Sequence, residues 1–262
     1  MKIRASLCSV ILTFAYMVSP FAYAKGALSE NIRITSDVLG YDLQYRVYLP
    51  EHISSDDKLP TIYITDGASY AKKGMIEALD AGISEGKIKP VIAIFVDARD
   101  PDDLKINRRN EQFFCKKDYV DFFTTELVPF IDQTYATSQQ REDRVILGVF
   151  FGGFNSGCFG LMETPYFSGI AMNSPAHSQF VRYLKKQYKT FDRKNLKIYM
   201  SVGNHVDNRH AVRSFKTALK EKGYDLTYEQ NNHGHNWENW TPLLPDVLET
   251  FFAVEHTEPQ EK

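Results

Sequence analysis

Short apolar runs alternate with amphipathic segments along most of the chain, and this alternation is the feature that most constrains its fold. The runs are rich in β-branched and aromatic side chains, which is typical of strands buried on both faces of a sheet. Strand–helix alternation predicts an α/β fold, with a mostly parallel central sheet and helices on both faces. The predicted strands cover residues 61–65, 91–96, 145–149, 169–172, 196–202 and 226–229.

A different pattern precedes these runs. Residues 32–38 and 42–49 alternate polar and apolar side chains on either side of Gly40, which predicts an antiparallel hairpin or a pair of edge strands. Segments with one apolar stripe predict helices, and a glycine directly follows the clearest of them. The predicted helices cover residues 118–135, kinked or interrupted at Pro129, residues 209–222, before Gly223, and residues 239–254.

Residues 1–24 have the pattern of a secretory signal peptide. Two basic residues precede a mostly apolar run, residues 5–18, and Ala22-Tyr23-Ala24 forms a small-x-small cleavage site. The apolar run is shorter than the roughly 20 residues that a membrane-spanning helix needs. We therefore expect cleavage after Ala24, a single domain over residues 25–262, and a product that is periplasmic or secreted, without a membrane partner.

The charge balance argues against nucleic acid as a partner. The chain has 31 basic and 33 acidic residues, a formal net charge of −2, so it has no overall positive field to attract a phosphate backbone. Removal of residues 1–24 would leave 29 basic residues and a net charge of −4. We therefore expect no nucleic-acid partner.

Two cysteines, Cys115 and Cys158, lie beyond the predicted cleavage site. Disulfides persist outside the cytoplasm, but the spacing of two cysteines in the sequence does not give their distance in space. The pair can either form a disulfide or remain as two isolated, buried thiols. The predicted fold does not depend on this bond.

The most informative segment joins the strand at residues 145–149 to the helix that follows it. Ligand sites in open α/β sheets form at the carboxyl ends of the strands. Here Gly148 and Gly152 flank Phe150 at the spacing of a G-x-S-x-G nucleophile elbow. The sharp turn of such an elbow needs small residues on both sides and points the central side chain into the site. In this chain that side chain is a phenyl ring, which has no proton to lose and no lone pair with which to attack.

Several segments, spread in order over some two hundred residues, match the pattern of one family. They are residues 63–67, 108–111, 126–135, the elbow with Gly152-Gly153, 173–175, 201–203 followed by Asp207, and 233–240. On these segments the chain resembles the putative-esterase family of α/β-hydrolases, which includes siderophore (enterochelin-type) esterases, feruloyl esterases and formylglutathione hydrolases. The resemblance implies an α/β-hydrolase fold and a Ser–His–Asp carboxylic-ester hydrolase that acts on a small-molecule ester without a cofactor or metal. Phe150 departs from the pattern, because the family has its nucleophilic serine there.

The resemblance also assigns an acid and a base. Asp207 follows a predicted strand at the place of the triad's acid, and the alternative is that it caps the next helix. His235 lies after the last predicted strand and matches the histidine that takes the nucleophile's proton. His233 is the competing candidate, because only one residue separates the two histidines.

The remaining candidates lie in loops around the elbow. The resemblance places an oxyanion hole after the strand at 61–65, formed by backbone N–H groups of Gly67 or Ala68 and of Phe151. An ordinary Asp-Gly turn at residues 66 and 67 is the alternative. A charged loop either lies beside the site, as in the family, or is a solvated charge cluster. We place Arg108, Arg109 and Glu111 of that loop, together with Trp237, among the candidate substrate-binding residues.

Phe150 leaves three hypotheses open. The chain can be an esterase scaffold that has lost its nucleophile by substitution, and it then hydrolyses esters negligibly. It can instead be a pseudoenzyme that binds an ester, a siderophore or an aromatic ligand. The third hypothesis is a metal-dependent hydrolase that activates water through a polar cluster. That cluster comprises His205, Asp207, His210, His233 and His235. We favour the first hypothesis because the surroundings of position 150 are retained.

Overall fold

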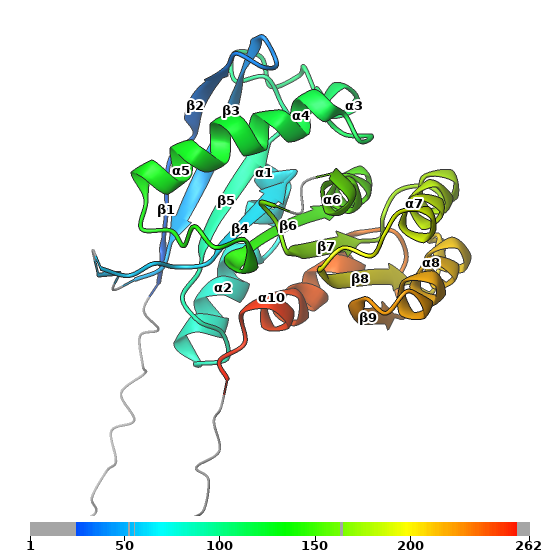
Figure 1. Cartoon of the computed structure of the whole chain (residues 1–262). Coiled ribbons are helices and arrows are strands. Elements are labelled where there is room, and N and C mark those ends of the chain that lie inside the picture. The colour runs from blue at the N-terminus through cyan, green and yellow to red at the C-terminus, as the bar shows by residue number, and fades with distance from the viewer. Residues whose placement is uncertain (1–24, 52, 55, 163–164, 256–262) are drawn as a thin grey trace, which may run out of the picture.

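A nine-stranded sheet runs through the computed structural model, which describes residues 25–51, 53–54, 56–162 and 165–255 (Figure 1). The strands are β1 (Ala27–Leu28), β2 (Ile32–Ser36), β3 (Tyr41–Leu49), β4 (Thr61–Thr65), β5 (Ile92–Asp97), β6 (Arg144–Val149), β7 (Gly169–Asn173), β8 (Lys197–Gly203) and β9 (Asp225–Asn231). Their order is β1-β3-β5-β4-β6-β7-β8-β9, and β2 pairs with β3 outside this path. Neighbours from β5 to β9 are parallel, whereas β1, β2 and β5 run antiparallel to β3. The predicted mostly parallel sheet and the antiparallel hairpin are therefore confirmed.

The last strand differs from its prediction in one respect. We expected residues 226–229 to be buried on both faces, but β9 is partly exposed along its whole length. That expectation is wrong because β9 lies at an edge of the sheet and, among the strands that the structure describes, pairs only with β8. The structure also adds β1, whose two residues are too few to show a pattern in the sequence.

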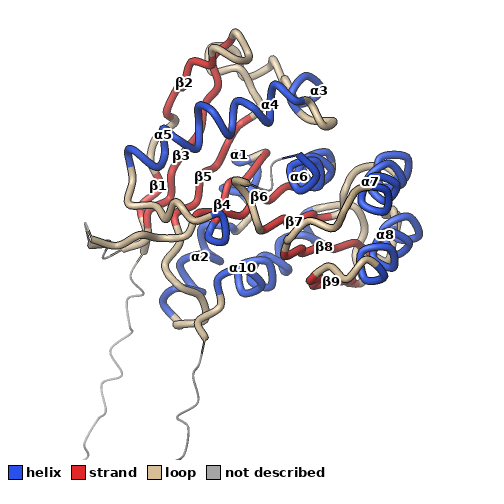
Figure 2. Tube along the Cα trace, viewed as in Figure 1, coloured by secondary structure: helices blue, strands red, loops and turns tan. Residues whose placement is uncertain are grey.

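Helices cover both faces of the sheet (Figures 1 and 2). One face carries α4, α5, α6, α7 and α8, and the other carries α2 and α10. The helices are α1 (Gly67–Lys72), α2 (Met75–Ser84), α3 (Arg109–Gln112), α4 (Lys117–Asp121), α5 (Val128–Thr134), α6 (Phe151–Met162), α7 (Ser178–Thr190), α8 (Arg209–Glu221), α9 (Trp237–Trp240) and α10 (Leu244–Phe252). Two separate apolar cores result, one on each face of the sheet.

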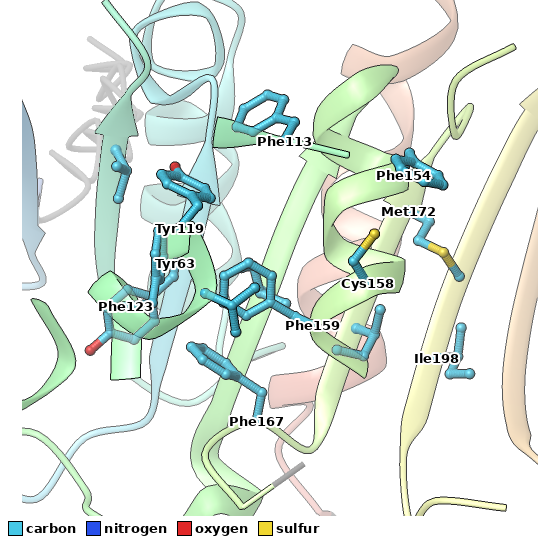
Figure 3. Packing of buried hydrophobic residues seen from close by; sticks show 14 of the residues in the cluster. Tyr63, Phe113, Tyr119, Phe123, Phe154, Cys158, Phe159, Phe167, Met172 and Ile198 are labelled. Atoms are coloured by element: carbon cyan, nitrogen blue, oxygen red, sulfur yellow. The ribbon is translucent and has the colours of Figure 1, made fainter. Parts of the chain in front are cut away.

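Alternate residues of the central strands point into opposite cores. Tyr63 of β4 belongs to the core under α6, whereas Ile62 and Ile64 belong to the other. In the first core, part of which Figure 3 shows, Phe167 packs edge-on against both Tyr63 and Phe159, with ring centroids 5.6 and 5.5 Å apart. Burial of one such side chain contributes about 1.5–3 kcal/mol to folding. These contacts fix α6 on the sheet, and the first residue of α6 directly follows Phe150.

The predicted helices are present with changed boundaries. Helix α8 ends before Gly223, which has a φ of 77°, as predicted. The helix predicted over residues 118–135 is interrupted before Pro129, by a π-helical stretch at Phe122–Leu127. Pro129 lies in the first turn of α5, which continues directly from the π-helical stretch. The helix predicted over residues 239–254 divides into α9, a 3₁₀ turn at Thr241–Leu243, and α10.

Cys115 and Cys158 form a disulfide. The bond joins the loop after α3 to the middle of α6, and Cys158 is fully buried. The sequence left two alternatives open, and the alternative of two isolated thiols is wrong.

The predicted signal peptide, residues 1–24, lies outside the described residues, as does the tail at 256–262. Within the described part of the chain, none of the helices is long and apolar enough to span a bilayer.

Candidate active site

The turn between β6 and α6 has the geometry of a nucleophile elbow. Phe150 at its centre has a φ of 54°, the left-handed region that costs a residue with a side chain about 1–2 kcal/mol. A Cβ added to Gly148 would lie 2.2 Å from the backbone carbonyl of Gly152, and one added to Gly152 would lie 2.8 Å from Oγ1 of Thr65. Both flanking residues must therefore be glycine, although the central residue is not a serine.

Asp207 and His235 form a hydrogen-bonded pair at the carboxyl ends of β8 and β9. The Nδ1 atom of His235 lies 3.0 Å from Oδ1 of Asp207, whose side chain is fully buried. Asp207 also accepts hydrogen bonds from the Ser174 hydroxyl at 2.7 Å and from the backbone N–H groups of Gly203 at 2.8 Å and Asn208 at 2.7 Å. Burial alone would raise the pKa of Asp207, but these hydrogen bonds outweigh it and hold the pKa below its ordinary value. Asp207 is therefore a carboxylate that orients the imidazole through its Nδ1 edge.

The other nitrogen of His235 faces no hydrogen-bond partner. Its Nε2 atom is buried and unpaired among the described residues. The imidazole lies between two aromatic rings, with Phe150 at 4.7 Å and an interplanar angle of 77°, and Trp240 at 5.0 Å and 89°. Because Asp207 accepts the Nδ1 proton, the free lone pair of a neutral His235 is on Nε2. An unpaired imidazole nitrogen thus lies beside the residue at the centre of the elbow.

The competing histidine lies elsewhere. His233 is exposed, and its carbonyl accepts a hydrogen bond from the backbone N–H of His205 at 3.0 Å. The side chain of His205 contacts Oδ1 of Asn232 at 2.8 Å. Within the residues that the structure describes, no three His, Cys, Asp or Glu side chains come together to hold a metal ion. The metal hypothesis, which grouped His205, Asp207, His210, His233 and His235, is therefore wrong.

A pocket of about 380 Å³ opens beside Phe150 and His235. Of the residues predicted from the sequence, Ala68, Arg109 and Trp237 also line it. Gly67 does not, because it packs against the backbone of Phe95, where a Cβ would lie only 2.3 Å away.

Phe151 is not among the residues that line this pocket. Its ring packs against Phe114 at 4.8 Å and Phe180 at 5.8 Å. The backbone N–H of Phe151 lies in the first turn of α6, and the N–H of Ala68 lies in the first turn of α1. N–H groups in a first turn have no partner within their own helix, so they can bind an anion.

The charged loop contributes one of its three candidate residues to the pocket. Arg109 forms an ion pair with Asp66, at 2.8 Å from Nε to Oδ1 and 2.9 Å from Nη2 to Oδ2. Burial raises the pKa of Asp66 to about 6, although Arg109 opposes this rise. Arg108 instead pairs with Asp100 at 2.7 Å and with Glu111 at 3.3 Å. Arg108 and Glu111 thus form a charge cluster outside the pocket, whereas Arg109 lies within it.

Two neighbours of this site were not identified from the sequence. His177, which precedes α7, packs edge-on against Phe150 with ring centroids 4.9 Å apart. Ser174 contacts Asp207 from the end of β7. Both lie after the buried strand β7, a position at which ligand sites form. Ser174 also belongs to the segment 173–175 that matches the family pattern, so two signals could have identified it.

Comparison with known proteins identifies a family and related sequences. Residues 36–251 match the model of the family described as Putative esterase. The chain is 28% identical over 236 residues to the uncharacterized protein YjcH of Bacillus subtilis, a match that covers 86% of this chain and 97% of YjcH. It is 23% identical over 233 residues to an acetyl esterase of Caldicellulosiruptor saccharolyticus, with 76% of this chain and 85% of that protein covered.

Solved structures of esterases have the same fold. A ferulic acid esterase superposes with a TM-score of 0.70 at 18% identity, over 87% of this chain and 98% of its own. The enterobactin esterase of Shigella flexneri, solved in the presence of enterobactin, superposes with a TM-score of 0.76 at 18% identity, over 85% of this chain and 58% of its own. The fold of the chain is therefore that of the α/β-hydrolases.

Proposed function

Because the chain belongs to the Putative esterase family, we propose that its pocket is a carboxylic-ester hydrolase site in which Phe150 occupies the place of the nucleophile. The unmodified chain then hydrolyses esters negligibly. One observation carries this proposal: the Asp207–His235 pair presents a buried, unpaired Nε2 atom beside the central residue of an intact elbow. An elbow with an acid and a base beside it is the arrangement with which hydrolases of this type cleave esters.

The geometry supports the following division of labour once a hydroxyl stands at position 150. The hydroxyl oxygen would attack the ester carbonyl while Nε2 of His235 takes its proton, and the alcohol would leave with that proton. Water would then release the acyl group by the same route. Asp207 would stabilise the imidazolium, and the N–H groups of Phe151 and Ala68 would stabilise the oxyanion.

Phe150 removes the first of these steps. In hydrolases of this type, loss of the nucleophile lowers turnover on the order of a million-fold, and binding and oxyanion stabilisation account for the residual rate. The ring of Phe150 also packs against the base that would have activated a hydroxyl. A bound ester would therefore remain intact.

A second candidate function is binding without catalysis. The pocket stays open beside Phe150, with Trp237 as an aromatic wall and Lys72 and Arg109 as basic groups. The esterases of similar fold include one described as a ferulic acid esterase and one solved with enterobactin, so a small ester, a siderophore or an aromatic ligand is the class to test. The hydrogen-bonded pair of Asp207 and His235 favours the hydrolase proposal over binding alone, because binding alone needs neither residue.

We also propose that residues 1–24 are a cleavable signal peptide and that residues 25–262 form one exported domain. The support is the basic start, the apolar run and the small-x-small site of the sequence. Expression of the full chain in a bacterial host, followed by fractionation and N-terminal sequencing, should give a periplasmic product that begins at Lys25. A cytoplasmic product that keeps Met1 would contradict this proposal.

The substitution Phe150→Ser tests the proposed hydrolase site. We expect kcat/KM on p-nitrophenyl acetate and butyrate to rise by on the order of a thousand-fold or more over the unmodified chain. Phe130→Ser is the matched control, because Phe130 is exposed on α5 and is not among the pocket residues. Equal rates for all three proteins would overturn the proposal. If methyl ferulate then raises the melting temperature of the unmodified chain, the binding function replaces it.

A further inference from the structure

Ser174 occupies the point where three segments of the site meet. It follows β7, is fully buried, and has a φ of 44°. Its Oγ atom lies 2.7 Å from Oδ2 of Asp207, which is in the loop between β8 and α8, and 2.8 Å from Nε1 of Trp240, which ends α9. The side chain of Asn239 is a more distant neighbour, with Nδ2 3.4 Å from both Ser174 Oγ and Asp207 Oδ2.

The direction of each hydrogen bond follows from the groups present. An indole N–H can only donate, so the Ser174 oxygen accepts from Trp240. An ionised carboxylate can only accept, so the single proton of the Ser174 hydroxyl is donated to Asp207. If the hydroxyl proton turned elsewhere, Oδ2 of Asp207 would lose this bond and keep the one from the backbone N–H of Gly203 at 2.8 Å.

Trp240 connects this junction to the base. Its ring packs edge-on against the imidazole of His235, at 5.0 Å and 89°, and both residues belong to the segment after β9. The Ser174 hydroxyl therefore fixes Asp207 through one bond and, through the other, the indole against which His235 rests. Hydrogen bonds of this kind to a charged group in a buried site are among the strong ones.

We propose that Ser174 is a positioning residue for the Asp207–His235 pair: its hydroxyl holds Oδ2 of Asp207 so that Oδ1 faces Nδ1 of His235. The assignment rests on the proposed function, because it gives Ser174 a part in the same hydrolase site. Ser174 does not act as the nucleophile, since its hydroxyl proton is committed to Asp207 and not to His235.

The first test uses the chain with Phe150 in place and needs no activity. The pKa of His235 is measured by NMR titration of its ring in the unmodified chain, in Ser174→Ala and in Ser174→Gly. Loss of the hydroxyl removes one of the hydrogen bonds that share the charge of Asp207, so in both variants the ring signals of His235 should titrate at a higher pH than in the unmodified chain. Ser174→Gly also suits the positive φ, which keeps the test valid if the alanine variant folds poorly.

Ser201→Ala is the matched control. Its hydroxyl is equally buried and donates to Oδ1 of Asn173 at 3.0 Å, and it has no bond to Asp207 or His235. The other charged groups that line the pocket are the same in all variants: Asp66, Lys72, Asp97, Arg99 and Arg109. A His235 pKa that is the same in Ser174→Ala, Ser174→Gly and Ser201→Ala would overturn the assignment.

The second test adds Ser174→Ala to the Phe150→Ser variant. We expect kcat on p-nitrophenyl butyrate to fall about tenfold with KM unchanged, the size of effect expected for one lost hydrogen bond to a charged group. Ser201→Ala in the same background should change neither value. An equal kcat for the Ser174→Ala and Ser201→Ala double variants would contradict the positioning role of Ser174. If Phe150→Ser alone shows no hydrolysis, the proposed function fails, and the NMR titration decides on Ser174 separately.

Discussion

The ring of Phe150 stands edge-on to the imidazole of His235, with 4.7 Å between the ring centroids. Aromatic rings at this distance and angle attract each other, and such pairs contribute about 0.5–1.5 kcal/mol beyond the area they bury. This contact therefore stabilises the site as it stands. Phe150→Ser would remove the ring, so that variant should lose this part of the folding free energy.

The identity of the base can be tested in the Phe150→Ser background. Adding His235→Ala should remove the gained activity and lower kcat/KM at least a hundred-fold, because general-base catalysis contributes about 10²–10⁴-fold. Adding His233→Ala should leave the activity unchanged, since His233 is exposed and lies outside the pocket. Steady-state kinetics on p-nitrophenyl butyrate separate the two variants. Activity that survives His235→Ala but not His233→Ala would show that the base is misassigned.

The elbow should not tolerate a side chain at its first glycine. In Gly148→Ala the new Cβ would lie 2.2 Å from the carbonyl of Gly152, a backbone group that cannot move aside. We expect a loss of about 1–3 kcal/mol in the free energy of unfolding, measured by urea denaturation. Gly86→Ala is the control: it has open space around it and a φ of 67°, so it carries only the cost of the positive φ. A Gly148→Ala variant no less stable than Gly86→Ala would contradict the close approach.

Stability should depend on pH through Asp66. Burial raises its pKa to about 6 in the folded chain, whereas in the unfolded chain the carboxyl ionises near pH 4. Between these values the folded state binds more protons than the unfolded state, so stability falls as the pH rises from about 4 to about 6 and is level above that. The free energy of unfolding of the unmodified chain should therefore decline over this window relative to Asp66→Asn. A difference between the two proteins that is constant with pH would refute the shifted pKa.

Asp207 should make stability depend on pH in the opposite direction. Its lowered pKa means that the folded state favours the charged form, which contributes stability above the unfolded pKa. That contribution is lost as the pH falls through the folded pKa, below about pH 4. In urea denaturation, the free energy of unfolding should fall more between pH 6 and pH 3 for the unmodified chain than for Asp207→Asn. Equal losses would argue against the hydrogen-bonded carboxylate.

The disulfide should contribute markedly to stability. Cys115 and Cys158 are 43 residues apart, and closing a loop of that length in the unfolded chain is worth about 4 kcal/mol in the chain-entropy treatment. Urea denaturation should show comparable decreases in the free energy of unfolding for Cys115→Ala and for the unmodified chain under reducing conditions. A reduced protein as stable as the oxidised one would contradict this expectation.

The centre of the sheet could be predicted from the sequence because its strands are buried on both faces. Runs such as residues 61–65, which are β-branched or aromatic at every position, are typical of strands that helices cover on both sides, so the pattern indicates both the strand and its environment. The exposure of β9 could not be predicted, because a strand becomes an edge through the order of strands in space. Local pattern carries no information on that order.

The site could be predicted where a residue at or beyond the carboxyl end of a strand also matches the role that the family pattern gives it. Asp207, His235 and the elbow glycines have such positions, and the structure brings them together around Phe150. Arg108 and Arg109 are neighbours in sequence, yet only Arg109 reaches the pocket, because their side chains leave the backbone in different directions. Trp240 and Ser174 are 66 residues apart, so their contact depends on the whole fold.

The positive φ of Phe150 belongs to the backbone and not to its side chain. Gly148 and Gly152 permit the turn, and the N–H and carbonyl of residue 150 are held by hydrogen bonds to Asn173 at 3.0 Å and Ala176 at 2.8 Å. None of these interactions uses the phenyl ring. The backbone therefore fixes the direction of the Cα–Cβ bond at position 150, whatever the side chain is. The Cβ atom of a serine, cysteine or aspartate there would occupy the same position beside His235. A single codon, with the rest of the chain unaltered, would then determine which reaction the pocket carries out.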